Sequence, residues 1–171
     1  MLLSSERLLE ASEMPTYEAT YRLDRTPAEV FDVIGTHCYE NHPRWEREVV
    51  EIRPLTPGPI GLGSRAIMIR EEFGRRSETE YEVTAFESAR RIAFRHPQAS
   101  ILFELGFDLR AAGASATDLT VHVRMEPKGA LRLLSPLFAL QLPRRSDRIT
   151  RSMIELVEAR PSASGTSPES A

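Results

Sequence analysis

Residues 26–34 have the sequence TPAEVFDVI, and this stretch decides the fold. Thr26 and Glu29 have the spacing of a capping box, in which each side chain accepts a hydrogen bond from the other residue's backbone N–H. Pro27 stands at the first helical position, where its missing N–H costs no hydrogen bond. We therefore expect a short helix that begins at Pro27 and is ended by Gly35.

Alternating apolar and polar residues predict strands on both sides of this helix. One strand precedes it and the others follow it, at 16–24, 48–55, 64–73, 76–86, 91–96, 100–109 and 116–125. A second short helix is expected at 36–46. A long helix begins near Leu131 or Pro136 and ends near Ala159, and Pro143 is expected to kink it. This order of elements predicts a curved sheet wrapped around a helix, with a cavity between them.

The composition is that of one globular domain. The chain has 171 residues, of which 41% are hydrophobic and 27% are charged, and this length suffices for a sizeable core. The net charge of -3 argues against a nucleic-acid-binding protein, which needs a basic surplus. A single cysteine, Cys38, excludes an intramolecular disulfide. We expect a flexible arm at 1–13, one domain at 14–159 and a disordered tail at 160–171.

The ends and the apolar runs bear on the cellular location. Residues 1–14 carry four charges and no continuous apolar core, so they do not form a secretory signal. The longest mostly apolar run, 130–142, is far shorter than the ~20 residues that cross a bilayer. We therefore expect a cytoplasmic protein, monomeric or homodimeric, without stable membrane insertion.

The order of elements resembles the START-like helix-grip superfamily, also called SRPBCC, which includes polyketide cyclases/dehydrases and ligand-transport proteins. The similar stretches lie at 26–34, 43–45, 61–64, 81–86 and 90–94, and the likeness covers about 15–158. The resemblance implies an α+β helix-grip fold. In this fold a curved, antiparallel seven-stranded sheet grips a long C-terminal helix, and two short helices after strand 1 seal one end.

Strand alternation and helical spacing together predict which side chains line the cavity. The predicted lining is mostly apolar with a few polar points: Trp45, Ile67, Ile69, Thr79, Tyr81, Val83, Phe94, His96, Phe103, Leu105, Phe107, Phe138, Leu142, Arg145 and Ile149.

Two of these residues carry the chemistry of a catalytic hypothesis. In an aldol-type cyclisation His96 is the candidate general base, and Tyr81 is the candidate donor to the developing enolate oxygen. Alternatively, His96 lies in solvent, because it stands at a strand end before Pro97.

Arg145 interrupts the apolar stripe of the last helix. A guanidinium facing the cavity needs an anionic partner, so one hypothesis is that Arg145 binds an acidic group of a ligand and pairs with Glu71 in its absence. The alternative is that the kink at Pro143 turns Arg145 into solvent.

Two other clusters of residues bear on metal binding and on membrane contact. His37, Cys38 and His42 are close in sequence, but their spacing fits no usual zinc site, and we expect no metal and no cofactor. Basic residues outnumber acidic ones across 124–151, next to several leucines. This pattern is either the solvated face of an amphipathic helix or a surface that touches anionic membranes.

Three functions compete on the sequence alone. The first is a non-catalytic carrier or sensor that binds a small hydrophobic molecule. The second is an enzyme similar to polyketide cyclases or dehydratases that uses His96 and Tyr81. The third is a protein-interaction module of the co-chaperone type, which would have a small or filled cavity and an exposed apolar patch.

Overall fold

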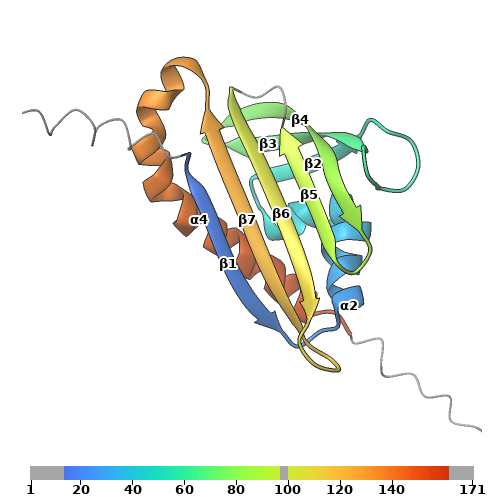
Figure 1. Cartoon of the computed structure of the whole chain (residues 1–171). Helices are drawn as coiled ribbons and strands as arrows, with labels where there is room; N and C mark the ends of the chain where they lie inside the picture. Colours follow the sequence, from blue (N-terminus) through green and yellow to red (C-terminus); the bar gives the residue numbers. More distant parts are fainter. Residues whose placement is uncertain (1–13, 97–99, 162–171) are drawn as a thin grey trace, which may run out of the picture.

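One antiparallel sheet forms the body of the protein. The computed structural model describes residues 14–96 and 100–161. Within these residues the sheet has seven strands in the order β1-β7-β6-β5-β4-β3-β2 (Figure 1). The strands are β1 (Thr16–Leu23), β2 (Val49–Pro54), β3 (Arg65–Glu72), β4 (Arg75–Glu87), β5 (Arg91–His96), β6 (Ile101–Ala111) and β7 (Thr117–Pro127). The predicted seven-stranded helix-grip fold is confirmed.

Helices stand at two places in the chain. Between β1 and β2 are α2 (Pro27–Phe31), a π-helical turn (Asp32–Thr36) and α3 (Cys38–Trp45). After β7 come a 3₁₀ turn (Gly129–Leu134) and α4 (Ser135–Glu158), which crosses one face of the sheet (Figure 1). Helix α4 continues through Pro143. No described helix is long and apolar enough to cross a membrane.

The capping box is formed as the sequence predicts. The Thr26 hydroxyl accepts from the Glu29 N–H at 3.3 Å, and a Glu29 carboxylate oxygen accepts from the Thr26 N–H at 2.8 Å. These bonds satisfy two backbone donors that a helix start otherwise leaves unpaired. Helix α2 therefore begins at Pro27, and it buries Val30 and Phe31.

Gly35 has a different role from the one predicted. The helical segment does not end there but continues as the π-helical turn to Thr36. A Cβ atom on Gly35 would lie 2.7 Å from a ring carbon of Phe31. Close packing of an aromatic ring, and not helix termination, therefore explains this glycine.

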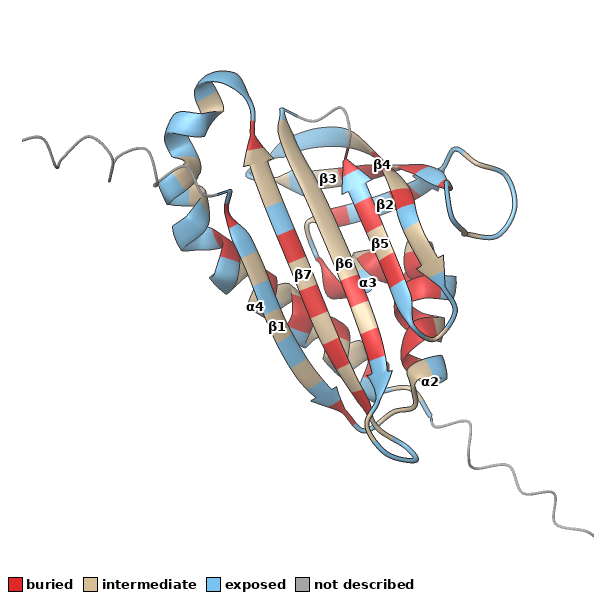
Figure 2. Ribbon diagram, viewed as in Figure 1, coloured by how far each residue is buried: buried red, intermediate tan, exposed pale blue. Residues whose placement is uncertain are grey.

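The core lies between the sheet and the helices. Along β7, buried side chains alternate with less buried ones (Figure 2), as expected for a strand with one face turned to the core. Helix α4 buries one stripe: Leu142, Ser146, Thr150, Met153 and Val157. After α4, Arg160 donates to Asp32 and Asn41. The predicted arm at 1–13 and residues 162–171 of the predicted tail lie outside the described residues.

The role of Gly35 can be tested by adding one methyl group. We expect Gly35→Ala to lower the free energy of unfolding by about 2 kcal/mol, because the new Cβ collides with the Phe31 ring. Urea unfolding followed by circular dichroism measures this change. Gly61→Ala is the matched control, because a Cβ at Gly61 meets nothing within 4 Å. Equal stability of the two variants would contradict the packing explanation.

Candidate functional site

A cavity of about 380 Å³ lies between the sheet and α4. Strands β3 to β7, α3 and α4 all contribute to its wall. Apolar side chains make up much of the lining: Cys38, Trp45, Met68, Phe94, Ile101, Phe103, Leu105, Phe107, Val121, Val123, Met125, Leu142, Ile149 and Met153. The polar lining residues are His42, Glu46, Arg70, Glu72, Thr79, Tyr81, His96, Arg145, Ser146 and Thr150.

The structure brings together most of the residues that the sequence placed in the cavity. These are Trp45, Thr79, Tyr81, Phe94, His96, Phe103, Leu105, Phe107, Leu142, Arg145 and Ile149. Four predicted residues are not in the lining: Ile67, Ile69, Val83 and Phe138. For the eleven lining residues, ligand binding stays a prediction. For the other four, the predicted place in the cavity wall is not found.

The two β3 residues fail for one physical reason. Successive side chains of a strand point to opposite faces, and Met68, Arg70 and Glu72 are the β3 residues that line the cavity. Ile67 and Ile69 therefore lie on the other face. Glu71 lies there as well, and it pairs with Arg76 at 3.5 Å. The partner of Arg145 is therefore Glu72 and not the predicted Glu71.

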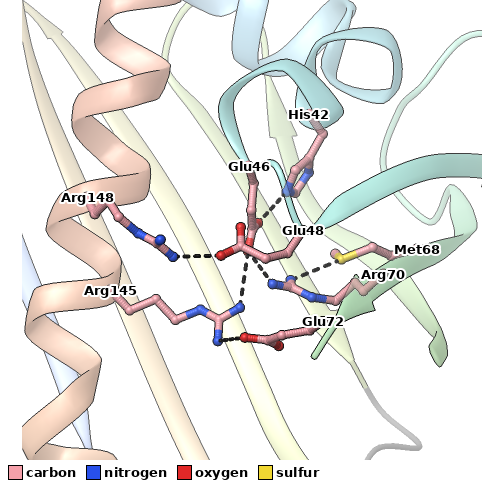
Figure 3. A network of polar contacts seen from close by, with 8 residues as sticks. All are labelled: His42, Glu46, Glu48, Met68, Arg70, Glu72, Arg145 and Arg148. Atoms are coloured by element: carbon pink, nitrogen blue, oxygen red, sulfur yellow. Dashed lines mark hydrogen bonds and ion pairs between the residues drawn. The ribbon is translucent and has the colours of Figure 1, made fainter. Parts of the chain in front are cut away.

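A polar network closes one part of the cavity wall (Figure 3). Its centre is Glu46, a carboxylate only 6% exposed, which follows α3. One oxygen is 2.9 Å from His42 Nε2, and the other accepts from an Arg70 Nη. Burial raises the pKa of Glu46, but the hydrogen bond from His42 and the charge of Arg70 outweigh it and lower the pKa to about 2. Glu46 is therefore ionised at neutral pH.

Arg145 joins this network from α4. One Nη is 3.2 Å from Glu72, and the other is 3.7 Å from Glu46. Its side chain is 40% exposed, so it lies at the edge of the cavity and not free in solvent. One turn further, Arg148 donates to Glu48 at 2.8 Å. These pairs connect α4 to β3 and to the start of β2.

A second polar pair lies deeper in the wall. The ring centroids of Tyr81 and His96 are 5.7 Å apart, and the two residues are 2% and 8% exposed, respectively. The expectation that His96 lies in solvent is therefore wrong. His96, the last residue of β5, pairs with Phe103 on β6. The Phe103 ring also packs edge-on against the imidazole. In the part of the chain that the structure describes, neither the Tyr81 hydroxyl nor His96 Nδ1 has a hydrogen-bond partner.

Burial sets the protonation of this pair. It lowers the pKa of His96 to about 4, and the nearby charge of Arg70 acts in the same direction. Burial also raises the pKa of the Tyr81 phenol. At neutral pH the imidazole is neutral and the phenol keeps its proton. The pair thus offers a free hydrogen-bond donor beside a neutral base.

The remaining cluster from the sequence consists of His37, Cys38 and His42. Among residues 14–96 and 100–161, no three His, Cys, Asp or Glu side chains are grouped as a metal site requires. Cys38 is buried, and burial raises the pKa of its thiol to about 12. It lines the cavity as a protonated thiol, which is a weak nucleophile.

The fold and the cavity agree with comparisons to known proteins. Residues 14–158 match the model of the polyketide cyclase/dehydrase and lipid transport family. The chain belongs to this family. No curated protein sequence matches it.

Solved structures show the same fold at low sequence identity. The Zhui aromatase/cyclase from Streptomyces sp. R1128 has a TM-score of 0.70 and 16% identity, over 91% of this chain and 100% of that one. A START superfamily protein from Mycobacterium smegmatis has a TM-score of 0.69 and 16% identity, over 85% and 98%. Norcoclaurine synthase from Thalictrum flavum has a TM-score of 0.64 and 9% identity, over 86% and 88%.

The buried neutral state of His96 gives a pH test. Unfolded histidine takes a proton below pH 6.5, but folded His96 stays neutral to about pH 4. The unfolded state therefore gains protons first, and stability falls as the pH falls through this window. Between pH 7 and pH 5 we expect a loss of about 2 kcal/mol from this residue.

Urea unfolding at the two pH values measures the loss. The His96→Phe variant should lose less stability than the wild type over this interval. Thr79→Val, which changes a cavity residue that does not titrate, should show the full loss. An unchanged pH dependence in His96→Phe would show that His96 is not buried in its neutral form.

Proposed function

We propose that this protein binds a small, largely apolar molecule in the cavity between the sheet and α4, as a carrier or sensor. The observation that supports this is the apolar lining of a cavity of about 380 Å³. Pockets with mostly apolar walls and a few polar groups are the usual form of small-molecule sites. The family, which includes lipid transport proteins, is consistent with this proposal.

The driving force would come from removing apolar ligand surface from water. Each buried methylene contributes about 0.8 kcal/mol, and the aromatic rings of Trp45, Phe94 and Phe107 supply contact area. The charged residues of the wall are already paired with one another through Glu46 and Glu72. The ligand therefore needs no net charge to be accepted.

Naphthalene is a simple probe of this proposal. Isothermal titration calorimetry should show one molecule bound per chain. Ser146→Phe places a ring in the cavity and should weaken binding at least about tenfold, a change of about 1.4 kcal/mol. Gln141→Phe adds the same ring on an exposed part of α4 and should bind as the wild type does. Equal loss in both variants, or no binding at all, would contradict the proposed site.

An enzyme similar to the cyclases of this family is the second candidate. The observation that favours it is the neutral, buried imidazole of His96 beside the protonated phenol of Tyr81. Such a base can remove a proton from carbon next to a carbonyl, while the phenol donates to the enolate oxygen. Both groups are within the cavity wall, as this chemistry requires.

The two functions differ in what His96 does. If the protein is an enzyme, His96→Phe should abolish turnover of a polyketide-like substrate and still bind naphthalene. Product analysis by mass spectrometry measures the turnover, and Thr79→Val serves as the control that keeps it. A wild type that binds poly-β-keto substrate analogues without converting them would favour the carrier.

The co-chaperone-type module has weaker support. Such a module would have a small or filled cavity, whereas the cavity here has a volume of about 380 Å³. Its favourable feature is a group of exposed leucines at the start of the last helical region: Leu133, Leu134, Leu137 and Leu140.

A further inference from the structure

The ligand's polar chemistry follows from two atoms in the cavity wall. The Tyr81 hydroxyl and His96 Nδ1 are buried and have no hydrogen-bond partner within residues 14–96 and 100–161. Most buried polar groups in proteins are hydrogen-bonded, and leaving one unpaired costs about 1–3 kcal/mol. Two such atoms in neighbouring side chains of one cavity therefore require an explanation.

Packing alone does not explain the Tyr81 hydroxyl. The Tyr81 ring makes edge-to-face contacts with Tyr39 and Phe94, at centroid distances of 6.3 and 5.6 Å. Phenylalanine would make the same ring contacts without burying an unpaired hydroxyl. Ring packing therefore does not account for the hydroxyl of this cavity-lining residue.

The two atoms have opposite hydrogen-bonding roles. The Tyr81 phenol is protonated and donates. A neutral imidazole carries one N–H and one lone pair, and in the tautomer with the proton on Nε2 the lone pair is at Nδ1. In this tautomer a donor and an acceptor lie on adjacent rings, whose centroids are 5.7 Å apart.

We propose that the ligand carries a hydroxyl group on its apolar body, and that this hydroxyl accepts a hydrogen bond from Tyr81 and donates one to His96. The proposal rests on the proposed function and specifies the ligand class: a phenol or an alcohol. A hydroxyl is the smallest group that both accepts and donates.

Other polar groups fit this place less well. A carbonyl accepts from Tyr81 but leaves the lone pair of Nδ1 unpaired. A carboxylate directs a negative oxygen at that lone pair. At the other polar region of the wall, the guanidinium groups of Arg70 and Arg145 are already paired with Glu46 and Glu72, so an acid gains little there.

Calorimetry with matched aromatic probes tests the proposal. On the wild type, 1-naphthol or 2-naphthol should bind at least about tenfold more tightly than naphthalene, because two hydrogen bonds are gained. Tyr81→Phe and His96→Phe should each reduce this ratio. Tyr39→Phe is the matched control, because Tyr39 packs on Tyr81 but does not line the cavity; it should keep the full ratio.

The outcomes separate this inference from the proposed function. Naphthalene binding that Ser146→Phe blocks, with neither naphthol bound more tightly, would overturn the hydroxyl inference and leave the proposed function standing. Failure of naphthalene, 1-naphthol and 2-naphthol alike to bind would overturn the proposed function itself. Tighter binding of 2-naphthoate than of 2-naphthol, lost in Arg145→Gln, would replace the hydroxyl with an acid as the preferred ligand group.

Discussion

The buried carboxylate of Glu46 is the interaction on which one wall of the cavity depends. Burying a charge is costly unless it is paired and hydrogen-bonded, and Glu46 finds its partners on three elements. His42 comes from α3, Arg70 from β3 and Arg145 from α4. Because one carboxylate needs all of them nearby, it fixes how α3, β3 and α4 meet. His42 also stacks on Trp45, with ring centroids 5.1 Å apart, so the network positions an aromatic ring of the lining.

The polar groups of the wall thus divide into two sets with different consequences. Around Glu46 the charges satisfy one another, so this set gives shape and rigidity to the wall. In the second set, the Tyr81 hydroxyl and His96 Nδ1 have no hydrogen-bond partner among the described residues, so this set is available to a ligand or a substrate. A carrier would use Tyr81 and His96 to hold a ligand by hydrogen bonds, whereas an enzyme would use them to move a proton.

The sequence could predict the elements whose signals are local. The capping box of Thr26 and Glu29 and the alternation along β6 and β7 need only neighbouring residues. Which face of β3 points to the cavity could not be predicted in this way, because both faces carry apolar residues: Ala66 and Met68 on one, Ile67 and Ile69 on the other. The deciding charge, Arg70, points inward against the usual rule for charged residues. Its reason is Glu46, 24 positions away in sequence.

The cavity itself depends on small residues in the stripe that α4 buries. Leu142, Met153 and Val157 are apolar, but Ser146 and Thr150 stand between them. Both are buried, and both line the cavity. Leucine at these two positions would extend the stripe and fill the space with apolar atoms, each methylene adding about 0.8 kcal/mol of stability. The chain forgoes this stability at two positions that line the same cavity as Tyr81 and His96. This is the arrangement expected if the space is kept for a ligand and not filled by the core.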